Sequence, residues 1–169
     1  LGCGMFVEEC RRPARDFPDV TVNEVIVDTM AMRLVRDPQS FDVIVTTNMF
    51  GDILSDEAAG LVGGLGMAPG LCIGEGDFAM AQATHGSAPD IAGTGQANPY
   101  AMIESTRMLL DWLGRRRGIA PALAAAATMQ RATVAMLADP AARTGDIRGS
   151  GTTATMTDSI IRRMGEVER

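Results

Sequence analysis

The stretch FDVIVTTNMFGDILSDEAAG, residues 41–60, carries the clearest indication of the fold class. Its first part, residues 42–47, is a short run of β-branched and apolar side chains, which is typical of a buried parallel strand. Its second part begins a helix that we predict over residues 50–65. Strands that alternate with helices define the α/β class, and we therefore predict an α/β fold.

The same alternation continues on both sides of this stretch. Upstream, the pattern predicts a surface helix over residues 4–16, which Pro13 ends or kinks, then a strand over residues 20–27 and a helix over residues 29–36. Downstream, glycines and prolines crowd residues 63–76, as in a segment that crosses between subdomains. Short strands are predicted at residues 71–73 and 78–84, and a long loop at residues 85–96. Helices follow at residues 99–116, 119–137 and 152–164, the first of them capped by Asn98.

The composition excludes several classes of function. The chain has 169 residues, of which 46% are hydrophobic and 21% charged, so it has the material for one folded core. A net charge of −6 argues against a nucleic-acid partner. No apolar stretch reaches the roughly 18 residues that a membrane span needs. The three cysteines lack CxxC spacing, and we expect a soluble, cytoplasmic protein with reduced thiols.

All fifteen basic residues are arginines, because the sequence contains no lysine. A mechanism that needs a lysine ammonium group therefore cannot run on this chain alone. The chain begins at Leu1 without a signal peptide or an initiator methionine, and we expect it to be a fragment or a processed product.

Two aspartates in the helix predicted at residues 50–65 are candidate metal ligands. A spacing of four residues puts Asp52 and Asp56 on one face of a helix, about 6 Å apart along its axis. Two carboxylates at this separation can share a divalent cation, and Asp28 at the end of a predicted strand is a third candidate. The alternative is that Asp52 interacts only with the helix dipole and that Asp56 is a solvated surface acid.

The segment THGSAPDIAGTGQANP, residues 84–99, is a candidate ligand-binding loop. Its small residues allow a ligand to approach the backbone closely. Asp90 can accept two ribose hydroxyls, and His85 offers a flat ring for stacking. The alternative is a surface crossover loop that holds the single histidine. No GxGxxG motif follows a predicted strand, so a Rossmann dinucleotide fold is not supported.

Three motifs together resemble one enzyme family. They are VDTMAMRLVRDPQSFDVIVTTNMFGDILSDEAAGLVGGLG (residues 27–66), THGSAPDIAGTGQANP (residues 84–99) and GTTATMTDSII (residues 151–161). In this order they resemble the isocitrate and isopropylmalate dehydrogenases, which oxidatively decarboxylate 2-hydroxy acids. The resemblance implies that family's own α/β fold. It assigns residues 1–63 to part of the smaller, dimer-forming and metal-site subdomain, and residues 64–169 to the C-terminal part of the larger, cofactor-binding subdomain.

The resemblance also implies a set of site residues. Asp28, Asp52 and Asp56 match the acids that bind Mg²⁺ or Mn²⁺ in the family, and Asp28 would reach the substrate and metal site of the neighbouring subunit of a homodimer. Asp90 stands where NADP-using members typically have lysine; an aspartate there would repel a 2′-phosphate, so the expected cofactor is NAD. The implied cofactor-binding residues are Asn48, Gln82, His85, Gly86, Ser87, Ala88, Pro89, Asp90, Ile91, Ala92, Gly93 and Asn98.

The family's acid–base pair has no counterpart in this sequence. The catalytic lysine and tyrosine of the family would lie upstream of Leu1, and the single tyrosine, Tyr100, does not match the catalytic one. We therefore expect the C-terminal portion of an NAD- and metal-dependent dehydrogenase for 3-isopropylmalate or isocitrate, with tartrate or malate as further possible substrates. The alternatives are a non-catalytic subunit that binds nucleotide or metal, and a degenerate remnant. The three metal acids argue against such a subunit, since non-catalytic chains of the family tend to lose them.

Overall fold

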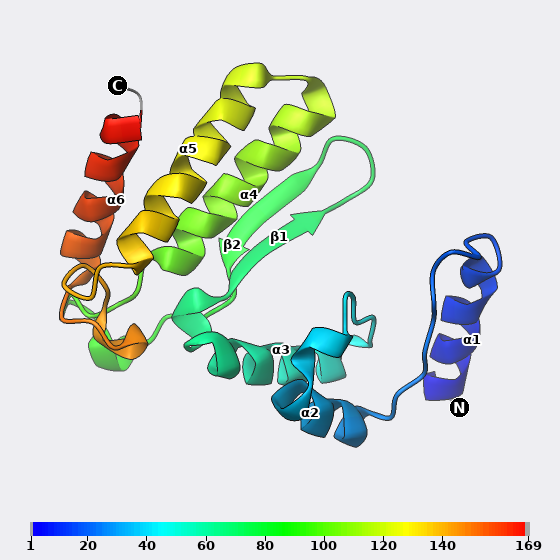
Figure 1. Ribbon diagram of the computed structural model, residues 1–169. Coiled ribbons are helices and arrows are strands. Elements are labelled where there is room, and N and C mark those ends of the chain that lie inside the picture. Colours follow the sequence, from blue (N-terminus) through cyan, green and yellow to red (C-terminus); the bar gives the residue numbers. More distant parts are fainter. Residues whose placement is uncertain (1, 168–169) are drawn as a thin grey trace. The chain divides into compact units, whose positions relative to one another are not determined.

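Six α-helices and one two-stranded sheet form the regular structure of residues 2–167, the part of the chain that the computed structural model describes (Figure 1). The helices are α1 (Gly2–Ala14), α2 (Val27–Arg36), α3 (Asn48–Val62), α4 (Tyr100–Arg117), α5 (Ala120–Leu137) and α6 (Thr153–Val167). The strands are β1 (Pro69–Ile73) and β2 (Ala79–Ala83). Two compact units divide between Leu61 and Val62.

The first unit is held together by a small apolar cluster between α2 and α3. Met30 and Leu34 of α2 are buried against Leu54 of α3. The Arg33 guanidinium lies over the Phe41 ring, 4.6 Å from its centroid, which adds a cation–π contact to this cluster. Helix α1 contributes no buried residue, and Pro13 lies within its last turn.

The strands predicted at residues 20–27 and 42–47 are wrong for the chain as described. Residues 21–26 and 43–47 carry no regular structure, and Val43 and Val45 are 80% and 68% exposed. Their β-branched side chains favour an extended backbone, but a strand also requires a neighbour that supplies the ladder of hydrogen bonds. Within residues 2–167 the sheet consists of β1 and β2 alone, so these segments have no strand to pair with.

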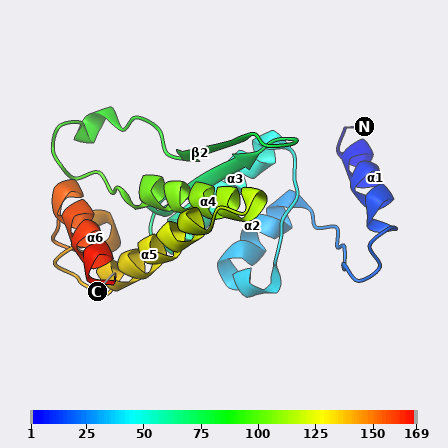
Figure 2. The same cartoon turned by 90° about the horizontal axis from the view of Figure 1, so that it is seen from above.

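In the second unit, α4 packs against the antiparallel hairpin and α5, and α6 packs against α5 (Figure 2). Strands β1 and β2 pair in register, with Leu71 opposite Ala81. The buried Ser105 of α4 links both strands of the hairpin to this helix. Its hydroxyl donates to the Gln82 carbonyl of β2 (2.8 Å) and accepts from the Gly70 amide of β1 (3.0 Å). The core between α5 and α6 contains Ala132, Met136, Ala142, Met156 and Ile160.

The turn after α4 and the close packing of α4 on α5 each require a glycine. Gly118 ends α4 with φ +66°, a left-handed conformation that favours glycine. At Gly114 a Cβ would lie 2.7 Å from the Leu123 side chain, so this glycine allows α4 and α5 to approach closely. Together these positions bring α5 back along α4.

The other helices and strands predicted from the sequence are confirmed to within a few residues. Helices α2 to α6, both strands of the hairpin and the loop after β2 occupy the expected positions. The side-chain Oδ1 of Asn98 accepts from the Tyr100 amide at 2.9 Å, which is the hydrogen bond of the predicted cap. Pro99, predicted as the first helical residue, lies just before α4. None of the described helices is long and apolar enough to cross a membrane.

Candidate cofactor loop and metal ligands

Residues 84–99 form an exposed loop that connects β2 to α4. The loop leaves β2 at Thr84, whose hydroxyl donates to the Ala68 carbonyl (3.0 Å), and contains one turn of 3₁₀ helix, Pro89–Ile91. Ala88, just before this turn, has φ +43°, an uncommon conformation for a residue with a Cβ. Such local strain is typical of ligand-binding segments. Residues 84–90 are all exposed, so the backbone that the sequence predicts to bind the cofactor is open to a ligand.

His85 and Asp90 both present polar groups in the exposed half of this loop. The His85 Nδ1 lies 2.9 Å from the Gly86 carbonyl oxygen, and because a carbonyl only accepts, Nδ1 carries the proton. Asp90 lies in the 3₁₀ turn with an exposed side chain. Its carboxylate is therefore available to accept hydrogen bonds from a bound molecule.

Asn98, at the end of the loop, is buried and fully engaged inside the protein. Its side-chain Nδ2 donates to Asp146 Oδ2 (2.9 Å), while Asp146 Oδ1 accepts from the hydroxyl of the buried Thr144 (2.6 Å). Its Oδ1 accepts from the Tyr100 amide at the start of α4. Sequence reasoning did not identify Asp146, because 48 residues separate it from Asn98 and no local pattern links them.

Asp52 and Asp56 lie one helical turn apart on α3, and both are exposed. Asn48, at the start of α3, donates from Nδ2 to Asp52 Oδ2 at 3.3 Å, so its side chain lies beside the candidate metal ligands. The donor set consists of carboxylates, which suit a hard cation such as Mg²⁺ or Mn²⁺.

Asp28 does not join the other two aspartates in the chain as described. It lies in the first turn of α2, where its Oδ1 accepts from the Thr29 amide (2.5 Å). Nowhere in residues 2–167 do three or more His, Cys, Asp or Glu side chains converge as a metal site would require. The structure thus places two exposed aspartates one turn apart on α3 and a separate aspartate on α2. Gln82, predicted to lie near the cofactor, has an exposed side chain on β2.

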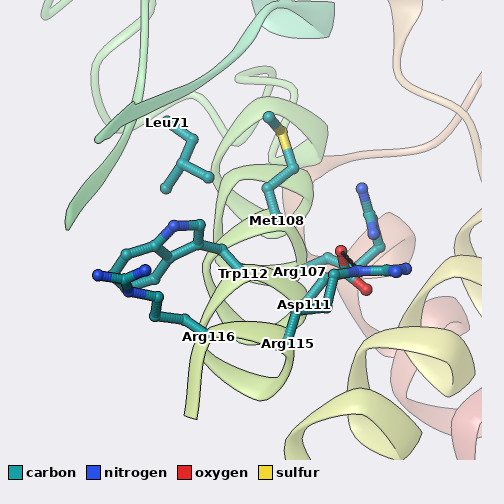
Figure 3. Close-up of a pocket in the computed structure, with 7 residues that line it drawn as sticks. All are labelled: Leu71, Arg107, Met108, Asp111, Trp112, Arg115 and Arg116. Carbon is teal, nitrogen blue, oxygen red and sulfur yellow. Dashed lines mark hydrogen bonds and ion pairs between the residues drawn. The ribbon is translucent and has the colours of Figure 1, made fainter. Parts of the chain in front are cut away.

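A separate cavity of about 610 Å³ lies between α4 and β1 (Figure 3). None of the site residues predicted from the sequence lines it. Leu71, Met108 and Trp112 form its apolar surface. Its arginines are matched by carboxylates: Arg107 pairs with Glu104 (2.6 Å), Arg115 with Asp111 (2.8 Å) and Arg116 with Asp77 (3.2 Å). The hydrogen bond from Arg115 lowers the pKa of Asp111, so this pair is mutually satisfied and offers little net charge to an anion.

Tyr100, the single tyrosine, packs against the core of the second unit. Its pKa is raised first by burial and then by the Glu104 carboxylate, against an opposing effect of Arg107. Because folding raises this pKa, the neutral phenol stabilises the folded state. This stabilisation is fully present below the ordinary tyrosine pKa of about 10, and it is lost as pH rises through the pKa of the folded state.

We expect the tyrosinate absorbance of the native chain to titrate at higher pH than that of the same chain in concentrated denaturant. No other side chain contributes to this signal, because the sequence has one tyrosine and the indole of Trp112 does not ionise in this range. A native midpoint at or below the denatured one would contradict the burial of Tyr100 described here.

Comparison with known proteins identifies similar chains. A family model described as isocitrate/isopropylmalate dehydrogenase matches residues 4–160. The isocitrate/homoisocitrate dehydrogenase of Thermus thermophilus is 48% identical over 158 residues, which cover 94% of this chain and 45% of that protein. A regulatory subunit of the mitochondrial NAD isocitrate dehydrogenase of Dictyostelium discoideum is 39% identical, with coverages of 96% and 44%.

A solved structure shows the same likeness in three dimensions. The crystal structure of isocitrate dehydrogenase from Methylococcus capsulatus superimposes with a TM-score of 0.87 at 44% identity, and the match covers 95% of this chain and 46% of that one. The expected α/β fold, as a partial form of the fold of these dehydrogenases, is therefore confirmed. The chain spans about half the length of the relatives that it matches.

Proposed function

Because this chain belongs to the isocitrate/isopropylmalate dehydrogenase family, we propose that it is the C-terminal portion of an NAD- and Mg²⁺- or Mn²⁺-dependent dehydrogenase. The reaction is the oxidation of a 2-hydroxy acid that bears a 3-carboxylate, followed by loss of CO₂. The substrate is 3-isopropylmalate or isocitrate, with tartrate and malate as further members of the same chemical class.

One observation carries the proposal: the four candidate carboxylates are not used in ion pairs. Among residues 2–167, arginines pair with seven carboxylates: Glu9, Glu24, Asp37, Asp77, Glu104, Asp111 and Asp139. No arginine of this part of the chain pairs with the exposed residues Asp28, Asp52, Asp56 and Asp90. Exposed carboxylates that stay unpaired in a chain with fifteen arginines are available to a cation or a hydroxyl-bearing ligand.

In this proposal these aspartates bind different parts of the cofactor and metal site. Asp90 accepts hydrogen bonds from the ribose hydroxyls of NAD, and the small residues around it let the backbone approach the nucleotide. Asp52 and Asp56 hold the metal from one protomer of a homodimer, and Asp28 reaches the site of the other protomer. When bound, the metal would supply Lewis-acid stabilisation of the enolate that loss of CO₂ leaves, and NAD would supply the hydride acceptor. The acid–base pair comes from the part of the longer protein that precedes this chain.

A non-catalytic subunit is the second candidate function. It is favoured by the likeness to a regulatory subunit over 96% of this chain. Asp28, Asp52 and Asp56 favour the dehydrogenase, because they match by resemblance the acids that hold the metal in the family, which non-catalytic chains tend to lose.

The metal assignment is tested by titrating the purified chain with Mn²⁺ in a calorimeter. We expect Asp52→Asn to weaken Mn²⁺ binding by at least about tenfold, the lower end of what even a partner outside the ligand shell contributes. Asp42→Asn is the matched control, since Asp42 is an exposed aspartate of the same unit. Equal affinities for the parent chain and Asp52→Asn would contradict the assignment.

A further inference from the structure

The first residue of α6 holds the cofactor loop from a distance in the sequence. The Thr153 amide donates to the Gly95 carbonyl at 2.8 Å. The Thr153 hydroxyl lies 3.0 Å from the same carbonyl and also contacts the Ala97 carbonyl, 58 and 56 residues away in sequence. Amides in the first turn of a helix have no partner within the helix, and the Gly95 carbonyl takes that place for the Thr153 amide. Figure 2 shows the loop after β2 returning to the start of α6.

The start of α6 is itself firmly fixed. Thr152 and Thr155 form a reciprocal cap, in which the Thr152 amide donates to the Thr155 hydroxyl (2.7 Å) and the Thr155 amide to the Thr152 hydroxyl (3.2 Å). Gly151 lies so close to the preceding loop that a Cβ there would be 2.5 Å from the Ala142 carbonyl oxygen. Three residues after Thr153, Met156 is fully buried in the core. Thr153 is therefore a fixed point against which a loop can be held.

The two halves of the cofactor loop differ in how they are held. Residues 95–98 are tied to the rest of the unit by Thr153 and, through Asn98, by Asp146. Residues 85–90 are exposed, and the hydrogen bond of His85 reaches only its neighbour Gly86. Gly93, with φ +75°, lies between the two halves. The anchored half thus limits the positions that the open half can adopt.

We propose that Thr153 is a positioning residue, which holds the cofactor loop in its binding conformation before NAD arrives. This inference rests on the proposed function, since it assumes that residues 85–93 bind NAD. Ordering a loop costs conformational entropy, and a loop that is already ordered binds its ligand more tightly. The Thr153 hydroxyl contributes to affinity without touching the cofactor.

Three variants separate this role from a structural one. Thr153→Val removes the hydroxyl and keeps the shape of the side chain, whereas Thr153→Ser keeps the hydroxyl. Thr157→Val is the matched control, because the Thr157 hydroxyl bonds only within α6, to the Thr153 carbonyl (2.8 Å). Each chain is compared by amide hydrogen exchange of residues 85–97, by calorimetric titration with NAD and by urea unfolding.

We expect Thr153→Val to speed exchange in residues 85–97 and to weaken NAD binding by about 2- to 12-fold, the range set by the loss of one hydrogen bond. Thr153→Ser and Thr157→Val are expected to match the parent chain in both measurements. Thr153→Ala repeats the test if valine is poorly accommodated.

Rates of amide hydrogen exchange in residues 85–97 that are unchanged in both Thr153→Val and Thr153→Ala would overturn the inference. Equal effects in Thr157→Val would also overturn it, because they would reflect only the stability of α6. Failure of the parent chain to bind NAD would instead count against the proposed function, and the exchange data would still decide whether Thr153 holds the loop.

Discussion

Replacing Met156 by alanine is expected to lower the free energy of unfolding by about 2–5 kcal/mol, the range for large-to-small changes in a core. Met156 is fully buried and packs with Ala132, Met136 and Ile160 where α6 meets α5. Most of its neighbours in this cluster are small or β-branched, so the remaining side chains have limited freedom to fill the cavity. The loss is a large fraction of the stability of an ordinary domain.

Urea unfolding followed by circular dichroism measures this change. Met102→Ala is the matched control, since Met102 lies on α4 with 51% of its surface exposed. Substitutions at such a surface position usually change stability by about 0.5 kcal/mol or less. Equal losses for Met156→Ala and Met102→Ala would contradict the packing of α6 on α5 and, with it, the fixed position of Thr153.

Combining Asp90→Lys with Ile91→Tyr is expected to raise the affinity for NADP relative to NAD by at least about tenfold. In the proposed complex the Asp90 carboxylate accepts the free 2′-hydroxyl of NAD and repels the 2′-phosphate of NADP. A lysine ammonium reverses this interaction, and a charged hydrogen bond contributes about 1.5–3 kcal/mol, which corresponds to tenfold or more.

The change in preference is measured by calorimetric titration of each chain with both nucleotides. Glu75→Lys provides the control, because it makes the same change of charge at an exposed position of the hairpin in the same unit. A general electrostatic effect would appear in this variant as well. If the ratio of the two affinities is the same in the double variant as in the parent chain, Asp90 does not face the ribose.

The elements that depend on local signals are the ones that the sequence predicts well. Helix α4 has the Asn98 hydrogen bond at its start and Gly118 at its end, and α5 has a proline in its first turn; these signals act within a few residues. The segment at residues 42–47 has an equally clear local pattern but is not a strand, because pairing depends on a neighbour that the described chain does not contain.

In the candidate site, too, the features set by neighbouring residues are predictable from the sequence, and those set by distant residues are not. The exposed loop and the spacing of Asp52 and Asp56 are evident from residue types and helical geometry. Their assignment to NAD and a metal came from the resemblance, since spacing alone is equally compatible with solvated surface acids. The anchors Asp146 and Thr153 escaped prediction because their partners lie 48 to 58 residues away in the sequence. Only the packing of the second unit brings them to the loop.

Calorimetric titration of the purified chain with NAD, after circular dichroism has established that it is folded, tests the central claim most directly. The account predicts saturable binding of one NAD per chain that is lost or weakened when NADP replaces NAD. A folded chain that releases or absorbs no heat of binding with NAD, and that retains no NAD in equilibrium dialysis, would contradict the assignment of residues 84–99 as the cofactor loop.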